Sequence, residues 1–181
     1  GAELKVPQEV LRGRVEEGRF LGYKVFLNWQ GDDYGDKRVQ DMLGANEMDL
    51  ADQLGLVVLL HVPRAGRLAD PEIQQGVQWL ARQWPRARIV LAHCGRCYLP
   101  GEMAAAVGCL RDLPNVSMDT AMVMDETVLR MAFDTLGPGR VLFATDFPVA
   151  AMRGRRVRVM SHWVDIVETG HPASAWRVPV Q

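Results

Sequence analysis

Three polar side chains stand where short apolar runs of the sequence end. His61 and His93 each follow such a run directly, and Asp146 comes just after the run Val141–Ala144. Apolar runs of this length between turn-forming residues are typical of parallel strands that are buried on both faces. The carboxyl ends of parallel strands share one edge of a sheet. We therefore expect these three side chains to converge, although they lie far apart in the sequence.

Two imidazoles and a carboxylate are ligands that suit a borderline divalent cation such as zinc. A bound cation would lower the pKa of a coordinated water to about 7 and so supply hydroxide near neutral pH. A carboxylate beside that water can take up its proton, and a histidine can polarise the substrate or protonate a leaving group. The three residues therefore predict a site for metal-assisted chemistry, with a divalent metal, preferably zinc, as cofactor.

Basic side chains near these strand ends are candidates for binding a small carboxylated substrate. Lys24 lies within the predicted strand Gly22–Leu27. Guanidinium groups in the loops can hold a carboxylate through two hydrogen bonds, whereas the alternative is that they are solvated surface arginines. The loop residues expected to border the site are Arg64, Arg96, Tyr98 and Arg153.

The segment Cys94-Gly95-Arg96-Cys97 allows other interpretations. A C-x-x-C pair at the junction of a strand and a helix can be a redox pair, and with His93 and Cys109 it can form a zinc site. The interpretation we favour is two incidental buried thiols. Histidines at strand ends are often core residues held by hydrogen bonds, and Asp146 can simply cap a turn. Asp119, at the end of a further strand, is expected to be structural.

The elements that must position these residues alternate between strands and helices at a spacing of roughly thirty residues, the size of a βαβ unit. Strands are predicted at Gly22–Leu27, Leu56–Leu60, Ile89–Ala92, Val116–Met118 and Val141–Ala144. Helices are predicted at Pro7–Gly18, at Gly101–Asp112 and at Arg155–Thr169. Three more are predicted from their caps: one that ends at Leu54 with Asn46 as a cap, one from Asp70-Pro71 to Trp84, and one from the Asp125 cap to Leu136. This order predicts a parallel sheet, either doubly wound or part of a (β/α)8 barrel; a complete barrel typically needs ~250 residues.

Composition fits one globular domain over residues 1–181, with an irregular tail over 170–181. The net charge of −1 gives no electrostatic case for nucleic acid or an anionic membrane. No apolar run approaches the ~20 residues needed to span a bilayer, and the layout of a signal peptide is absent. Three cysteines, an odd number, do not suggest a disulfide framework, so a cytoplasmic location is expected.

Several motifs resemble the amidohydrolase superfamily, most closely its amidohydrolase-related branch. That branch includes aminocarboxymuconate semialdehyde decarboxylase and dicarboxylic lactone hydrolases. H-V-P-R, L-A-H-C-G-R and L-F-A-T-D-F-P are similar to its strands five, six and eight, and G-Y-K-V-F and N-V-S-M-D-T to its strands four and seven. The resemblance covers roughly Pro7–Pro148. It implies an α/β fold that is a partial (β/α)8 TIM barrel, with strands four to eight present and the first three missing.

The resemblance also implies roles for single residues. His61 matches a metal ligand, His93 the histidine near metal and substrate, and Asp146 the aspartate that binds metal and activates water. Lys24 matches a position that is a carboxylated ligand in some members and faces the substrate or is structural in others. The implied activity is that of a metal-dependent hydrolase or a non-oxidative decarboxylase.

The chain departs from the superfamily in one respect. The H-x-H pair of the first strand is missing, because the only histidines are residues 61, 93, 162 and 171. The alternative function is therefore a catalytically incomplete partial barrel that needs another chain or an upstream segment. Five parallel strands cannot close a barrel, which leaves two sheet edges and inward apolar side chains such as Val25, Leu59 and Val90 uncovered. We therefore expect a homo-oligomer, a complex with the missing half of the barrel, or an aggregation-prone, loosely packed state.

Overall fold

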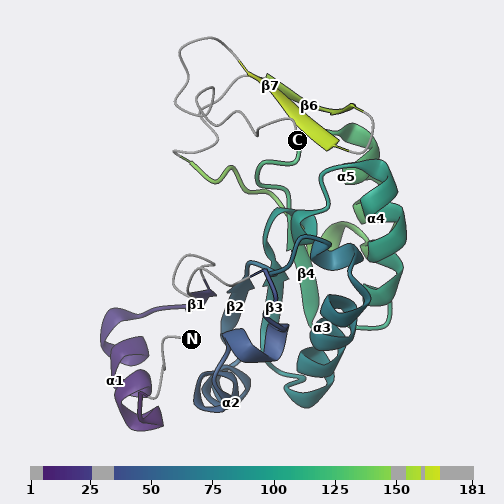
Figure 1. The fold of residues 1–181 in the computed structure, drawn as a ribbon. Helices are drawn as coiled ribbons and strands as arrows, with labels where there is room; N and C mark the ends of the chain where they lie inside the picture. Colours follow the sequence, from purple (N-terminus) through teal and green to yellow (C-terminus); the bar gives the residue numbers. More distant parts are fainter. Residues whose placement is uncertain (1–5, 26–34, 148–153, 160–161, 168–181) are drawn as a thin grey trace.

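The computed structural model describes residues 6–25, 35–147, 154–159 and 162–167 of the chain (Figure 1). Five parallel strands form one sheet in the order β1-β2-β3-β4-β5, with bounds Gly22–Val25, Val57–Leu60, Arg88–Leu91, Val116–Asp119 and Val141–Leu142. The α-helices between and before them are α1 Gln8–Gly18, α2 Ala45–Leu54, α3 Pro71–Gln83, α4 Pro100–Ala106 and α5 Glu126–Leu136. Short 3-10 helices are Val39–Met42, Arg67–Ala69, Ala92–Arg96, Val107–Leu110 and Pro138–Arg140. The predicted α/β fold with a parallel sheet is confirmed.

The two faces of the sheet differ in what covers them. Val25 pairs in register with Leu60, and Leu60 with Leu91, and all three are buried on the face that the helices cover. The row on the opposite face runs through Lys24, Leu59, Val90 and Ser117. The expectation that Val25 points inward is therefore wrong. Because side chains alternate along a strand, the inward position next to it belongs to Lys24.

Two helices begin where local capping chemistry predicts. The Asp70 side chain accepts a hydrogen bond from the Glu72 amide at 2.9 Å at the start of α3. The Asp125 carboxylate accepts one from Thr127 at 2.8 Å at the start of α5. These carboxylates satisfy amides that have no partner within the first helical turn. Asn46 is not a cap: α2 begins after Gly44, and the Asn46 side chain donates to the carbonyl of Val6.

The helix predicted for Arg155–Thr169 is wrong. Residues Gly154–Val159 form β6 and His162–Val167 form β7, an antiparallel pair in which Val159 lies opposite His162. The segment alternates arginine with valine from Arg156 to Val159, and this period of two, with β-branched residues, favours strands. The remaining predicted residues of this helix, the tail, and residues 26–34 lie outside the described part of the chain.

The last strand of the sheet is shorter than predicted. β5 ends at Leu142 because the Ala144 amide donates to the Thr120 hydroxyl at 3.2 Å instead of continuing the ladder. In the part of the chain that the structure describes, no helix has both the length and the apolar character to cross a bilayer.

Candidate active site

His61 and His93 meet above the ends of β2 and β3. Their rings lie edge to face, with centroids 4.9 Å apart and planes at 77°. Burial is the largest cause that lowers the pKa of His61 to about 3, and His93 and the cations Arg96 and Lys24 lower it further. At neutral pH this imidazole is therefore uncharged, the form that can bind a cation.

His93 occupies a tightly held turn. His93, Cys94 and Gly95 have consecutive left-handed backbones, with φ of 56°, 49° and 64°. The left-handed conformation costs non-glycine residues roughly 1–2 kcal/mol each. Burial lowers the pKa of His93, while the carboxylates of Asp119 and Asp146 oppose that effect.

Asp119 supports that turn. One of its oxygens, Oδ1, accepts the His93 amide at 2.8 Å and the Ala121 amide at 3.0 Å. The His93 ring nitrogen Nδ1 lies 3.2 Å from the carbonyl oxygen of Ala121. Asp119 was expected to be structural, and the structure shows that what it supports is the turn carrying His93.

Asp146 reaches the site from the far edge of the sheet. Its Oδ1 lies 3.9 Å from Nζ of Lys24, which belongs to β1 at the opposite edge. In a flat sheet, four strand spacings would separate β1 from β5 by about 19 Å. The Lys24 side chain and the loop that carries Asp146 beyond the end of β5 bridge this distance.

Two arginines join the loops that carry the histidines. Arg96 Nη1 donates to the carbonyls of Val62 at 3.0 Å and Arg64 at 3.3 Å. The carbonyl of Arg96 itself accepts a hydrogen bond from Arg67 Nη1 at 3.2 Å. Arg67 also pairs with Glu102 at 3.1 Å and lies 5.2 Å from the centre of the Tyr98 ring. Arg96 and Tyr98, predicted to bind substrate, thus take part in loop packing.

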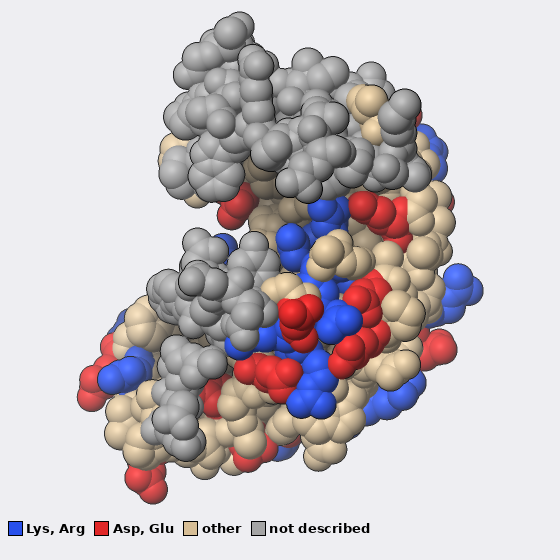
Figure 2. All heavy atoms as spheres, in the orientation of Figure 1, with Lys and Arg blue, Asp and Glu red and all other residues tan. Residues whose placement is uncertain are grey.

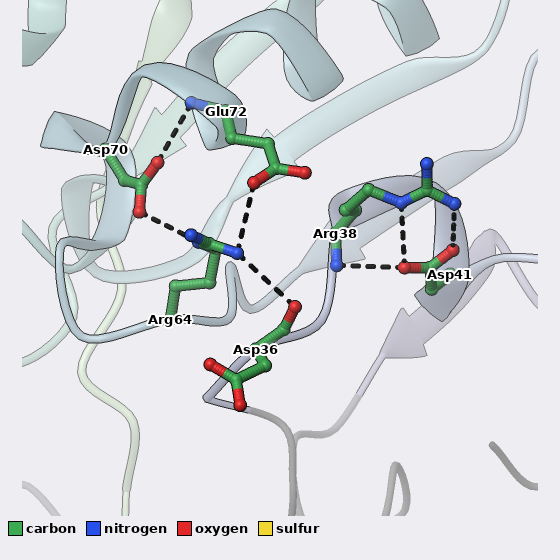
Figure 3. Close-up of polar contacts among 6 residues, drawn as sticks. All are labelled: Asp36, Arg38, Asp41, Arg64, Asp70 and Glu72. Carbon is green, nitrogen blue, oxygen red and sulfur yellow. Dashed lines mark hydrogen bonds and ion pairs between the residues drawn. The ribbon is translucent and has the colours of Figure 1, made fainter.

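Arg64 points into an acidic network instead of toward the histidines. Its guanidinium lies 2.8 Å from Asp70 Oδ2, 3.1 Å from Glu72 Oε2 and 3.3 Å from the Asp36 carbonyl oxygen (Figure 3). These partners raise the pKa of Arg64, with the Asp70 hydrogen bond the largest cause. Acidic and basic side chains lie interspersed over this face of the molecule (Figure 2).

The structure thus brings together His61, His93, Asp146 and Lys24, with Arg96 beside His61. It gives Arg64 other partners, and Arg153 lies outside the described residues. Sequence reasoning missed the contribution of Arg67, which is 8% exposed. Nothing in the sequence distinguishes Arg67 from surface arginines, whereas the position of Asp119 at a strand end was a usable signal.

Comparison with known proteins identifies the family of the chain. A family model described as amidohydrolase matches residues 8–158. The chain belongs to the amidohydrolase family. The resemblance read from the motifs is thereby confirmed over nearly the same residues. No curated protein sequence matches the chain.

Solved structures share the fold at low sequence identity. An amidohydrolase from Burkholderia multivorans is 21% identical, with 82% of this chain covering 58% of that one at a TM-score of 0.59. A second crystal form of that protein contains bound zinc. The 4-oxalomesaconate hydratase from Rhodopseudomonas palustris is 19% identical, and the match covers 85% of this chain and 51% of the hydratase at a TM-score of 0.59. The 5-carboxyvanillate decarboxylase from Sphingomonas paucimobilis is 17% identical, and the match covers 78% of this chain and 52% of the decarboxylase at a TM-score of 0.51. This chain therefore spans 51–58% of the length of these proteins.

The donor types of this amidohydrolase site suit a divalent metal, but they form an incomplete set. His61 is neutral, and Nδ1 of His93 faces a carbonyl, which leaves Nε2 of His93 as the nitrogen with a lone pair. Asp146 adds a carboxylate. Among the described residues, however, no three His, Cys, Asp or Glu side chains are placed to hold one ion. Further ligands would have to complete the set.

The two cysteines of the C-x-x-C segment are buried thiols. Burial raises the pKa of Cys94 and of Cys97 to about 12 in each case, and neither forms a disulfide. An acidified redox thiol has a lowered pKa instead. The redox interpretation is therefore not supported.

A groove of about 490 Å³ lies beside the site, not at it. Its lining comes from the loop before α5, from α5 and from β5: Thr120, Met122, Val123, Met124, Leu129, Phe133, Val141, Phe143, Ala144 and Thr145. Neither His61 nor His93 lines this groove, so it does not mark the reacting centre.

Proposed function

We propose that this chain carries part of the active site of a metal-dependent hydrolase or non-oxidative decarboxylase that acts on a small carboxylated compound. The observation that carries the proposal is the contact between His61 and His93 at the strand ends of an amidohydrolase fold, with the Asp146 carboxylate near enough to act on the pKa of His93. We further propose that β1 to β5 correspond to strands four to eight of a barrel. The contact between Lys24 of β1 and Asp146, which follows β5, supports this because it suits strands that curve toward one another.

In this proposal His61, His93 and Asp146 would move closer together to hold a divalent ion, preferably zinc, and ligands from outside the described residues would complete the set. The ion would polarise the substrate and acidify a water molecule. Asp146 would accept a proton from that water, and Lys24, 3.9 Å from the carboxylate, would stabilise its negative charge. Lys24 and Arg96 give the site positive charge, and this charge favours a substrate carboxylate.

The metal proposal is tested by elemental analysis of the purified protein after dialysis. We expect about one divalent ion per active site, because catalytic zinc sites hold a single ion. His61→Ala and Asp146→Asn should each lower the occupancy severalfold, since each removes a ligand. Asp112→Asn, which changes an exposed carboxylate at the other end of the sheet, should leave occupancy unchanged. Equal metal content in all four proteins would refute the assignment.

The catalytic proposal is tested by turnover on a panel of small carboxylic acids, following both carbon dioxide release and hydrolysis. Asp146→Asn should lower kcat by two or more orders of magnitude, roughly the contribution of a general base combined with a metal ligand. Asp112→Asn is again the control. Turnover at the wild-type rate in Asp146→Asn would exclude this mechanism.

A second candidate is an incomplete half-site that another chain completes. Two observations favour it: the absence of a three-ligand group among the described residues, and the coverage of only 58% of the Burkholderia amidohydrolase. In that case metal and activity should appear only when the complementary chain is added. Metal bound tightly by this chain alone would argue for the first candidate.

A further inference from the structure

We infer that Asp119 is a positioning residue that fixes both the backbone turn and the ring tautomer of His93. The inference rests on the proposed function for its significance, because it concerns which nitrogen of His93 is presented to the site. Asp119 itself need not touch the substrate or a metal. It acts through two hydrogen bonds on one of its oxygens.

The first part of the argument is the backbone. His93 and Cys94 both have left-handed conformations, which side chains other than glycine rarely adopt. Such a turn persists only when its surroundings hold it in place. Asp119 is 6% exposed, and its Oδ1 accepts the His93 amide at the first left-handed residue. A hydrogen bond to a charged, buried acceptor is stronger than one between neutral groups.

The second part is the imidazole. The group facing Nδ1 of His93 is the Ala121 carbonyl, at 3.2 Å, and a carbonyl can only accept. Nδ1 must therefore carry the proton, so Nε2 is left with its lone pair. The Ala121 amide bonds to the same Asp119 oxygen that holds His93. One carboxylate oxygen thus places both the histidine and the residue whose carbonyl selects its tautomer.

An ordinary capping role is the alternative, and the chain offers a matched comparison. Asp125 also accepts two backbone amides through one oxygen, from Thr127 at 2.8 Å and Val128 at 3.3 Å. It caps α5 and has no hydrogen bond to His93 among the described residues. If Asp119 were only a cap, its removal should affect stability in the way that the removal of Asp125 does, with no specific change at His93.

The test is nitrogen-15 NMR of the two ring nitrogens of His93 in metal-free protein at neutral pH. In the wild type we expect a protonated Nδ1 and a bare Nε2. Asp119→Ala should change His93 to a mixture of tautomers, whereas Asp125→Ala should lower Tm with the His93 signals unchanged. A wild-type ring protonated at Nε2 would overturn the inference. Wild-type His93 signals in folded Asp119→Ala would also overturn it.

A second variant covers the case in which Asp119→Ala does not fold. Asp119→Asn keeps an oxygen of the same shape but makes it a weaker, neutral acceptor. The His93 and Ala121 amides should then exchange with solvent about tenfold faster relative to the Thr127 and Val128 amides, a change of about 1.4 kcal/mol. An equal change in both pairs of amides would contradict the inference. Neither measurement needs substrate or metal, so the inference about Asp119 can be tested whether or not the proposed function holds.

Discussion

Unusual backbone conformations gather at the loops where the chemistry is proposed. Of the described residues other than glycine with positive φ, most lie just beyond strand ends: Arg64, Arg67, His93, Cys94, Arg96, Met122 and Asp146. Such conformations cost free energy and persist where packing and hydrogen bonds impose them. Here the bonds from Asp119, Arg67 and Arg96 do so. Single residues outside the reacting set therefore determine the geometry of the reacting ones.

The thiols of Cys94 and Cys97 should be unreactive in the folded protein. Burial raises the pKa of each to about 12, so almost no thiolate exists at neutral pH. Iodoacetamide at pH 7.5 should modify the half-buried Cys109 first, and all three cysteines only after denaturation. The measurement is mass spectrometry of the intact and digested protein, with Cys109→Ser as control. Rapid labelling of Cys94 would restore the redox interpretation.

The sequence predicted which side chains lie near one another at the strand ends better than it predicted the partners of the arginines. His61, His93 and Asp146 follow strongly apolar runs, so topology alone brings them to one edge of the sheet. Arg64 was expected near the substrate, but its orientation depends on Asp70 and Glu72, which belong to the start of the next helix. Which acidic residues pair with Arg64 depends on side-chain geometry, and the spacing of residues in the sequence does not show that geometry.

At the scale of elements, the helix α2 contains a buried carboxylate that works against stability. Glu47 is 5% exposed, and its oxygens have no hydrogen-bond partner among the described residues. Burial raises the pKa of Glu47. The folded state therefore holds this proton more tightly than the unfolded state does. The free energy of unfolding consequently falls as pH rises from the unfolded pKa of about 4.3 through the higher folded pKa.

Glu47→Gln should raise the free energy of unfolding at pH 7 by about 1 kcal/mol, because it removes an uncompensated buried charge. It should also flatten the loss of stability above about pH 4.3. Urea unfolding from pH 4 to pH 8 measures both effects. Glu102→Gln is the contrasting control: Glu102 accepts the amides of Tyr98 and Leu99 and pairs with Arg67, so its loss should destabilise. Destabilisation by both variants would contradict the assignment for Glu47.

Elements with a strong local signal were predictable, and those without one were not. The side chains of Asp70 and Asp125 each accept a hydrogen bond from an amide of the following helical turn, and α3 and α5 begin directly after them. The segment Arg155–Thr169 has no helix cap. Its polar and β-branched residues alternate with the period of two that is typical of strands, not with the period of 3.6 that a helix needs. The residues pair across two strands, Arg156 with Asp165 and Val157 with Val164, so the stabilising contacts are not local in sequence.

At the scale of the whole molecule, the sheet has two edges and an apolar surface near β5. Leu142, Phe143 and Phe147 are 44%, 89% and 77% exposed. Burying apolar surface yields ~25 cal/mol per Å², and unpaired strand edges favour pairing with another chain. We therefore expect the protein to be a homo-oligomer or part of a complex. Sedimentation velocity at micromolar concentration should show a species larger than a monomer.

Phe143→Ser should shift that equilibrium toward monomer, because Phe143 lies next to the β5 edge. Val10→Ser changes an exposed apolar residue of α1 and should not. A monomer that unfolds cooperatively, with sedimentation unaffected by either change, would show that the exposed surface has no partner.

The order of the strands has a consequence for synthesis on the ribosome. Each of β2 to β5 pairs with the strand that precedes it, so every strand can add to an edge already formed as the chain emerges. His61 and His93 can come together once β3 has docked, while Asp146 arrives only with β5. The nascent chain therefore carries the two imidazoles without their carboxylate while residues 94–145 are added, and Asp146, which is proposed to activate water, is the last of the three to arrive.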